Sequence, residues 1–270
     1  MAIVNGTNFA DTLNGTEQAD SIHGNGGNDT LHGNGGNDFL DGGLDVGADS
    51  DTIDGGAGVD TVSYAQVDHA IGVNLLQGIG LGSGNVDTLV SIENVTGTNS
   101  DDSLVGDLGA NLIQGADGRD FVDGSGGNDT LFGNGGNDVL KGNVGSDVLA
   151  GSTGADTLTG DIPGGKEADT FRYFNTADSG VGLGHRDVVT DFQHGVDKLD
   201  LHSVDAKAGT SGDQAFTFVG GAGFSAEGQA RAFFEGDHTV VQLNTGGANG
   251  AESEIQLAGH VTVSAGDFVL

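Results

Sequence analysis

Residues 23–43 read HGNGGNDTLHGNGGNDFLDGG and contain nearly the same nine residues twice. Each copy has a six-residue turn, rich in glycine, that ends in aspartate; any residue and then an aliphatic residue follow. Alignment of the whole chain on this aspartate gives two arrays, with members nine residues apart, or 13 apart before Asp51 and Asp169. The first array contains Asp11, Asp20, Asp29, Asp38, Asp51 and Asp60. The second contains Asp102, Asn111, Asp120, Asp129, Asp138, Asp147, Asp156 and Asp169.

An apolar residue stands two positions after every member of both arrays. These residues are Leu13, Ile22, Leu31, Leu40, Ile53, Val62, Leu104, Ile113, Val122, Leu131, Leu140, Leu149, Leu158 and Phe171. A nine-residue period drifts from the 3.6-residue period of a helix, so each unit is predicted to be a turn plus a three-residue strand whose middle side chain points inward. Such units are stable only when stacked, two to a coil, which predicts an all-β solenoid with a narrow aliphatic core.

The composition restricts the possible partners. The formal net charge is −32, and no Lys or Arg occurs before Arg119. A surface of this kind repels nucleic acid and anionic lipid and attracts cations, although an acidic excess alone is typical of any solvated or disordered face. The chain has no Cys, no N-terminal signal of the Sec type and no stretch near the roughly 20 apolar residues that span a bilayer.

The repeated aspartates have two interpretations. Each one alone is typical of a solvated turn. In a stack, however, like turns 18 residues apart bring carboxylates about 5 Å from one another, and these repel unless a cation lies between them. Ca²⁺ prefers carboxylate and carbonyl oxygens, whereas the absence of Cys, and of His at this position, disfavours zinc and copper. The turn residues expected to expose carbonyls are Gly24, Asn25, Gly26, Gly27, Gly33, Asn34, Gly35, Gly36, Gly124, Gly126, Gly127, Gly133, Asn134, Gly135, Gly136 and Gly142.

Four copies of the repeat carry a resemblance to a known family. GNGGNDTLH (24–32), GNGGNDFLD (33–41), GSGGNDTLF (124–132) and GNGGNDVLK (133–141) resemble the nonapeptide of RTX (repeats-in-toxin) proteins. The resemblance implies a parallel β-roll in which each Ca²⁺ ion is held by the sixth-position Asp and carbonyls of two turns 18 residues apart. Ten candidate pairs follow: Asp11–Asp29, Asp20–Asp38, Asp29–Asp51, Asp38–Asp60, Asp102–Asp120, Asn111–Asp129, Asp120–Asp138, Asp129–Asp147, Asp138–Asp156 and Asp147–Asp169.

Some segments depart from the repeat. GTNFAD (6–11) and GTEQAD (15–20) lack two glycines, and Asn111 has no charge, so weaker sites are expected there. The four-residue insertions before Asp51 and Asp169 are expected to distort their turns or to supply extra oxygens. Residues 64–96 lose the period; strands there are expected to continue the stack without metal turns, with Asp68, Asp87 and Glu93 as surface groups.

The composition changes after Phe171. ADTFRY, DVVTDFQHGVDKLDL and the terminal DFVL resemble the C-terminal cap of serralysin-type secreted proteases, and an atypical aromatic unit would close the open end of a solenoid. The resemblance implies that DFVL is an uncleaved signal for type I secretion machinery; the alternative is that it is simply a last strand. Asn and Glu replace Asp in LNTGGANGAESEI (243–255), which disfavours an ion in that loop.

No catalytic motif accompanies the repeats: His-Glu-x-x-His, Gly-x-Ser-x-Gly and nucleotide-binding glycine patterns are all absent from the sequence. The predicted organisation is a first roll array (1–63), a non-repeat β insertion (64–96), a second array (97–172) and a cap (173–270). We therefore expect a monomeric, non-catalytic, secreted calcium-binding protein that folds when it meets extracellular Ca²⁺. Two alternatives stay open: a module of a secreted protease, lipase or epimerase, and a membrane-active or adhesive RTX protein.

Overall fold

The computed structural model describes residues 1–43, 49–82, 84–246 and 250–270. The chain forms two compact units, Met1–Thr130 and Leu131–Leu270, which are described separately. Within the described residues the regular structure is β, apart from the single 3₁₀ turn η1 (Ala265–Asp267). The insertion before Asp51 falls largely at 44–48, outside the described residues, and the loop LNTGGANGAESEI lies partly outside them, at 247–249.

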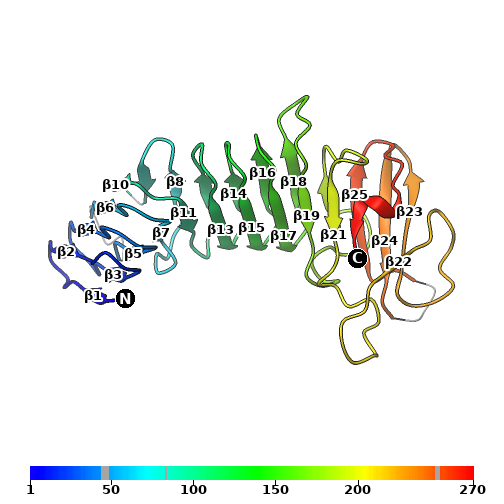
Figure 1. Ribbon diagram of the computed structural model, residues 1–270, viewed down its shortest axis with the longest axis horizontal. Coiled ribbons are helices and arrows are strands. Elements are labelled where there is room, and N and C mark those ends of the chain that lie inside the picture. The colour runs from blue at the N-terminus through cyan, green and yellow to red at the C-terminus, as the bar shows by residue number, and fades with distance from the viewer. Residues whose placement is uncertain (44–48, 83, 247–249) are drawn as a thin grey trace. The chain divides into compact units, whose positions relative to one another are not determined.

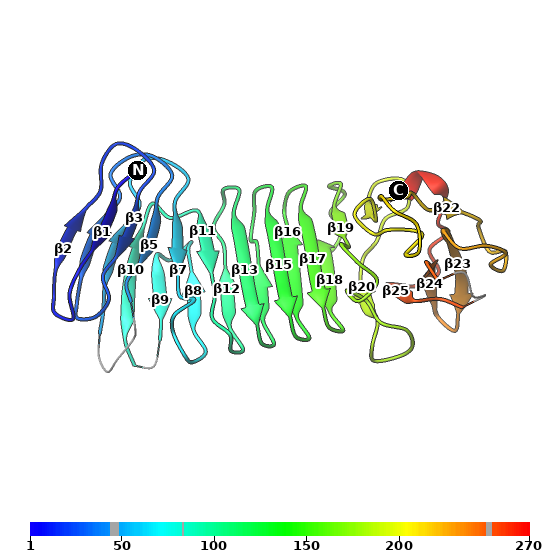
Figure 2. The ribbon, with the colours of Figure 1, turned by 90° about the horizontal axis from the view of Figure 1, so that it is seen from below.

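The first unit is built from short strands that alternate between two sheets (Figures 1 and 2). One sheet contains, in spatial order, β1 (Ile3–Asn5), β3 (Ser21–His23), β5 (Phe39–Asp41), β7 (Thr61–Ser63), β11 (Asn94–Thr96) and β13 (Leu112–Asp117). The other contains β2 (Thr12–Asn14), β4 (Thr30–His32), β6 (Thr52–Asp54), β10 (Val86–Val90), β9 (Ile79–Leu81), β8 (Gly72–Asn74), β12 (Ser103–Val105) and β14 (Phe121–Asp123). Neighbours in the first sheet are all parallel.

The register places equivalent repeat positions side by side. Leu13 pairs with Leu31 and Leu31 with Ile53, so one aliphatic side chain stacks directly on the next through successive coils. All 14 apolar residues predicted to point inward are at most 9% exposed, and 13 of them are fully buried. Each contributes roughly 1.5–3 kcal/mol by leaving water. The predicted all-β class, parallel roll and aliphatic core are confirmed.

The non-repeat segment differs from expectation in two respects. β10 stacks on β6 and β8 on β12 in parallel, as predicted, but β9 lies between them and is antiparallel to both. Asp87 is 3% exposed and accepts hydrogen bonds from Asp51 N (2.9 Å) and Tyr64 Oη (3.0 Å), so its expected surface position is wrong. Glu93 is half-buried and accepts from Asp60 N at 2.8 Å. Asp68 is exposed, as expected.

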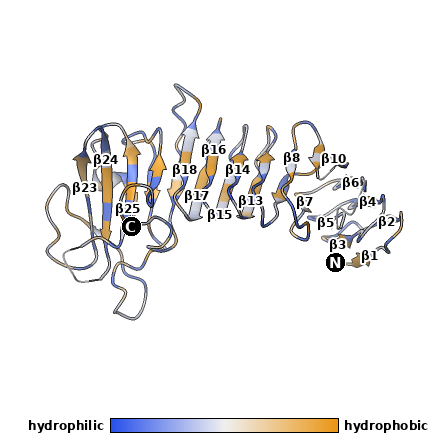
Figure 3. Cartoon of the chain, turned by 180° about the vertical axis from the view of Figure 1, so that it is seen from behind, coloured by the Kyte–Doolittle hydropathy of each residue, from blue (hydrophilic) through white to orange (hydrophobic). Residues whose placement is uncertain are grey.

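The second unit continues the same coil architecture and ends in the cap. One series of strands is β15 (Thr130–Gly135, beginning at the last residue of the first unit), β17 (Val148–Thr153), β19 (Thr170–Arg172), β21 (Lys198–Asp200) and β26 (Phe268–Val269). The other is β16 (Val139–Asn143), β18 (Thr157–Asp161), β20 (Asp187–Val189), β25 (Ser253–Ala258), β24 (His238–Asn244), β23 (Gln229–Glu235) and β22 (Thr217–Phe218). Figure 3 shows hydrophobic residues concentrated on these strands.

The cap changes from parallel coils to an antiparallel meander. β25 pairs in parallel with β20, and β24 and β23 follow in antiparallel order, which confirms the strands predicted in SEIQLAG, HTVVQLN and RAFFEG. The C-terminal Phe268 pairs with Leu199 of β21 and is 8% exposed, and its ring lies 5.0 Å from that of Phe218. The terminal DFVL is therefore a structural last strand in this unit, whatever else it does.

Candidate metal centres

The array aspartates contact one another through a regular backbone–carboxylate ladder. The backbone N–H of each one donates to Oδ1 of the aspartate one coil later. The donor–acceptor distances are 2.8 Å for Asp11–Asp29, Asp20–Asp38, Asp29–Asp51, Asp102–Asp120, Asn111–Asp129 and Asp138–Asp156, 2.7 Å for Asp38–Asp60 and 2.9 Å for Asp147–Asp169. Eight predicted pairs are thus adjacent, with separations of 18 or 22 residues. Asp120–Asp138 and Asp129–Asp147 would join the two units and stay predictions.

The second carboxylate oxygen is what makes these turns candidates for a metal. Oδ2 of Asp29, Asp38, Asp60 and Asp156 is buried and accepts no hydrogen bond. Buried polar groups are otherwise almost always paired, and an orphaned carboxylate oxygen carries a large desolvation cost. A cation beside this oxygen would remove that cost.

Glycine opens the space around that oxygen. A Cβ added to Gly24 would overlap Oδ2 of Asp29 and the carbonyl oxygen of Gly42 in the next coil. Gly33 has the same relation to Asp38 and Gly55, and Gly133 and Gly142 lie as close to the carboxylates of their own turns. Each such turn therefore brings a carboxylate oxygen and, in the best cases, a carbonyl oxygen together, which is the donor set that Ca²⁺ prefers.

The remaining turn residues have the strained backbone that the sequence predicted. Asn25, Asn34 and Asn134 have φ of 75°, 73° and 72°, and the side chains of the first two donate to carbonyls of the preceding coil. The fourth-position glycines also have positive φ and approach the preceding turn too closely for a side chain: Gly27, Gly36 and Gly127. Gly136 shares the positive φ. Gly26, Gly35, Gly124, Gly126 and Gly135 complete the same turns.

Threonine closes three of the turns. Thr16 replaces the turn asparagine, and its N–H and Oγ1 donate to Oδ2 of Asp20 at 2.6 and 2.7 Å. Thr7 does the same for Asp11. In the third such turn the Thr98 N–H reaches Oδ2 of Asp102 at 2.6 Å. The oxygen that is orphaned at Asp29 or Asp38 is satisfied here, which gives a physical reason to expect weak sites at Asp11, Asp20 and Asp102.

We expect that exchanging Asn and Thr at the second position of a turn weakens or strengthens the calcium site of that turn. Asn34→Thr should give Asp38 the hydroxyl donor that Asp20 has and lower the number of bound calcium ions by one. The substitution should also lower the free energy of unfolding modestly, because Thr tolerates the φ of 73° poorly. Thr16→Asn is the reciprocal variant and should raise calcium affinity. Calcium stoichiometry measured by calorimetry decides the prediction; an unchanged count in Asn34→Thr contradicts it.

Burial and like charges make the metal-free turns costly to ionise. Burial, with Asp87 and Asp29 nearby, raises the pKa of Asp51 from 3.8 to about 7. Burial and Asp138 raise the pKa of Asp156 to about 7, and burial and Asp147 raise that of Asp169 to about 8. The pKa values of Asp29, Asp38, Asp60 and Asp102 shift in the same direction, again mainly through burial. Asp20 is the exception: backbone and Thr16 hydrogen bonds lower its pKa.

Four ladder residues escaped the sequence prediction. Asp87 and Glu93 continue the ladders of the first unit, as described above. In the second unit Asp187 accepts from Asp156 N at 2.9 Å, and Asp197 accepts from Asp169 N at 3.1 Å. Each is followed two positions later by a buried apolar residue (Leu89, Val95, Val189 and Leu199). An acidic residue followed two positions later by an apolar one could have identified these four positions, although the glycine-rich turn of the repeat does not precede them.

No group of three or more Asp, Glu or His side chains with metal-binding geometry occurs in the described ranges. A roll turn offers one carboxylate and several carbonyls, so its donor set is not a cluster of side chains.

Residues 21–270 match the family described as Peptidase M10 serralysin C terminal. The chain belongs to this family. The match includes the cap segments that suggested it, all of the second array and the first array from residue 21 onward.

Solved structures provide further comparisons. The R3 subunit of a mannuronan C5-epimerase from Azotobacter vinelandii is 27% identical over 63% of this chain and 78% of that one, with a TM-score of 0.33. The R2 subunit of the same enzyme is 26% identical over 66% and 92%, with a TM-score of 0.36. An extracellular lipase from Serratia marcescens is 17% identical over 99% and 40%, with a TM-score of 0.31. No match was found among the curated proteins.

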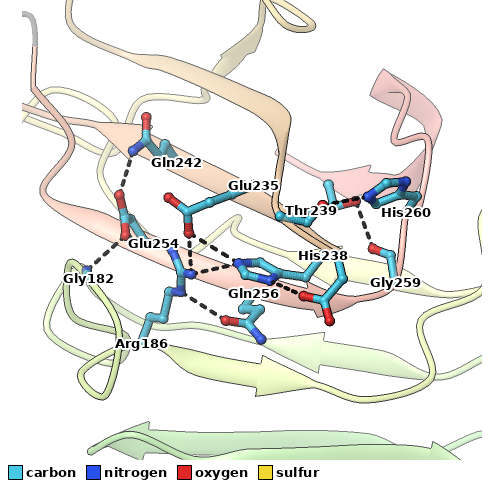
Figure 4. Close-up of polar contacts among 12 residues, drawn as sticks. Gly182, Arg186, Glu235, His238, Thr239, Gln242, Glu254, Gln256, Gly259 and His260 are labelled. Atoms are coloured by element: carbon cyan, nitrogen blue, oxygen red, sulfur yellow. Dashed lines mark hydrogen bonds and ion pairs between the residues drawn. The ribbon is translucent and has the colours of Figure 1, made fainter.

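The serralysin-type cap contains a dense polar network of its own (Figure 4). The Arg186 side chain, 2% exposed, pairs with Glu235 at 2.6 Å and Glu254 at 3.2 Å, and His238 Nε2 lies 2.9 Å from its Nη2. Glu254 also accepts from Gly182 N at 2.8 Å. The network ties the loop before β20 to the meander. These contacts give the Arg186 network the character of a structural anchor within the cap.

Proposed function

We propose that the protein is a secreted, calcium-binding RTX module that folds when Ca²⁺ occupies the turns of its β-roll. The observation that carries the proposal is the buried, orphaned Oδ2 of Asp29, Asp38, Asp60 and Asp156 beside glycines that leave room for an ion. Membership of the serralysin C-terminal family supports it. When bound, the ion would supply positive charge between stacked carboxylates.

The charge of the chain supports the same proposal. With 40 acidic and eight basic residues, the chain repels itself in any compact state unless cations neutralise part of it. Ten divalent ions would supply about +20 against −32, if each candidate pair held one. Extracellular modules bind Ca²⁺ at roughly 10⁻⁴–10⁻³ M, so the sites would fill outside a cell and stay empty in a cytosol poor in calcium.

Export is part of the proposal. We expect the C-terminal segment to be read by type I secretion machinery while the calcium-free chain is unfolded. In the folded state Phe268 is buried in strand β26, so this part of the segment would be accessible only before folding. Among the described residues no helix is long and apolar enough to cross a membrane.

A second candidate function is that of a non-catalytic module of a larger secreted enzyme. The family description, the C-terminal part of a peptidase, favours it. Both candidates require calcium-driven folding of this chain, and the full reading frame of the gene distinguishes them. We also propose that the module acts as a monomer.

Calorimetry with two aspartate variants tests the calcium proposal. Asp29→Ala and Asp129→Ala each remove a carboxylate shared by two candidate pairs, one in each array. Each variant is expected to bind one or two fewer calcium ions than the unaltered protein. Asp68→Ala, which removes an exposed carboxylate, is the matched control and should bind the same number. Equal stoichiometry in all four proteins would overturn the pairing scheme.

A further inference from the structure

An acidic cluster lies outside the aspartate ladder, at the insertion that precedes Asp169. β18 ends at Asp161, and the next residues turn back on themselves, with Gly165 N donating to Ile162 O at 2.9 Å. A cavity of about 510 Å³ opens beside this turn, and Asp161, Lys166, Asp191 and Gln193 contribute to its wall. The insertion thus forms part of the wall of this cavity.

Asp161 is held rigidly in this pocket with one oxygen unsatisfied. The residue is 6% exposed. Its Oδ2 accepts from Gln193 Nε2 at 2.6 Å, whereas its Oδ1 is buried and accepts no hydrogen bond. A Cβ added to Gly165 would overlap this Oδ1, so glycine is what leaves room beside it. Asp161 therefore presents an oriented carboxylate oxygen without a donor.

Two further carboxylates approach Asp161. The Glu167 carboxyl is in hydrogen-bonding contact with it, and two acceptor groups can share such a contact only through a proton or a cation. Asp191 Oδ1 accepts from Gly160 N at 3.0 Å and its Oδ2 from Asp161 N at 2.7 Å, so its charge is fixed beside the pocket. Burial, followed by these neighbours, raises the pKa of Asp161 to about 6.

We propose that Asp161 Oδ1 and the Glu167 carboxylate, beside this pocket, form an additional divalent-cation site, with Asp191 supplying further negative charge. It differs from the ladder sites because side chains rather than turn carbonyls supply the ligands. Asp161 and Glu167 are already in contact, and no third Asp, Glu or His side chain joins them in the described residues, so binding would separate these two carboxylates around the ion. The inference rests on the proposed calcium function and adds one site of different construction.

The test counts bound calcium in the full chain by calorimetry and by equilibrium dialysis. Asp161→Asn keeps the shape of the side chain and its contact with Gln193 but removes the ligand charge; it is expected to bind one ion fewer. Glu167→Gln changes an exposed side chain and should lower the affinity of the same site several-fold. Asp68→Asn, an exposed carboxylate in the first unit, is the charge-matched control and should bind the full number.

The outcomes separate this inference from the proposed function. If the unaltered protein binds no calcium, the proposed function fails. If it binds calcium and both Asp161→Asn and Glu167→Gln bind the same number with the same affinity, the function stands and the additional site is wrong. That second result would mean that Lys166 or a proton neutralises Asp161. A circular dichroism spectrum of each variant in calcium confirms that a lost ion is not a lost fold.

Discussion

Removal of calcium with a chelator is expected to unfold most of the β-roll. Each site with a dissociation constant of about 10⁻⁴ M contributes about 1.4 kcal/mol at 1 mM Ca²⁺, because a ligand that binds only the folded state stabilises it by RT ln(1 + [L]/Kd). Ten such sites together contribute about 14 kcal/mol, which is as large as the total stability of a typical domain. Burial of the thin aliphatic core is already offset by the entropy cost of ordering the chain, so it cannot replace that contribution.

The measurement combines far-ultraviolet circular dichroism with small-angle scattering during a calcium titration. Without calcium, the β signal should be largely lost and the chain expanded. Both should return cooperatively in millimolar Ca²⁺, since each coil is stabilised by its neighbours. Magnesium is the control, because its demand for octahedral geometry suits carbonyl-lined turns poorly. A melting temperature that is the same in chelator and in calcium would contradict the proposal.

Acidification is expected to stabilise the calcium-free protein, the reverse of ordinary acid denaturation. The pKa values of Asp51, Asp156 and Asp169 in the fold are about 7, 7 and 8, against 3.8 for an unperturbed Asp. The fold therefore holds protons more tightly than the unfolded chain. The stabilisation is fully present below about pH 4 and is lost as the pH rises to about 8. At about 1.4 kcal/mol per pKa unit, each residue changes stability by a few kcal/mol.

Calcium should reverse this dependence, because the ion binds ionised carboxylates and competes with protons. The folded fraction, followed by far-ultraviolet circular dichroism from pH 4 to pH 9, once in chelator and once in millimolar Ca²⁺, should therefore give curves of opposite slope. Asp169→Asn, which mimics the protonated side chain, should flatten the chelator curve near pH 8. A calcium-free protein that becomes more stable as the pH rises would show that the buried aspartates are ionised without a metal.

The repeat register predicted the fold well because it specifies both the turn and the inward side chain at every step. Leu31 and Leu40 occupy the core where the nine-residue period placed them, and the partners of Asp29 and Asp38 lie one coil away, as expected. A strict period leaves few alternatives, since a slip of one residue would turn every apolar side chain outward. Metal occupancy of these turns stays a prediction.

The parts that the sequence did not predict depend on contacts between segments that do not repeat. Asp87 is buried with a hydrogen bond from Tyr64, 23 residues earlier in the chain. No local sequence pattern predicts that contact. The closing of the Asp20 turn by Thr16 needed the geometry of a hydroxyl four residues away. Asp161 lies in an insertion, where the period that identified the other aspartates is absent.

The antiparallel strand β9 has a consequence for how the first unit finds its register. The glycine turns of the first array are nearly alike, so a growing stack could shift by a whole coil of 18 or 22 residues and still bury one aliphatic side chain on another. The β8–β9–β10 insert occurs once. Its Asp87, and Glu93 just after it, accept hydrogen bonds from Asp51 N and Asp60 N, the last aspartates of the first array. This segment therefore fixes the register of the stack, because a shift by one coil would separate Tyr64 from Asp87 and Asp60 from Glu93. The segment that breaks the repeat is what tells the repeats apart.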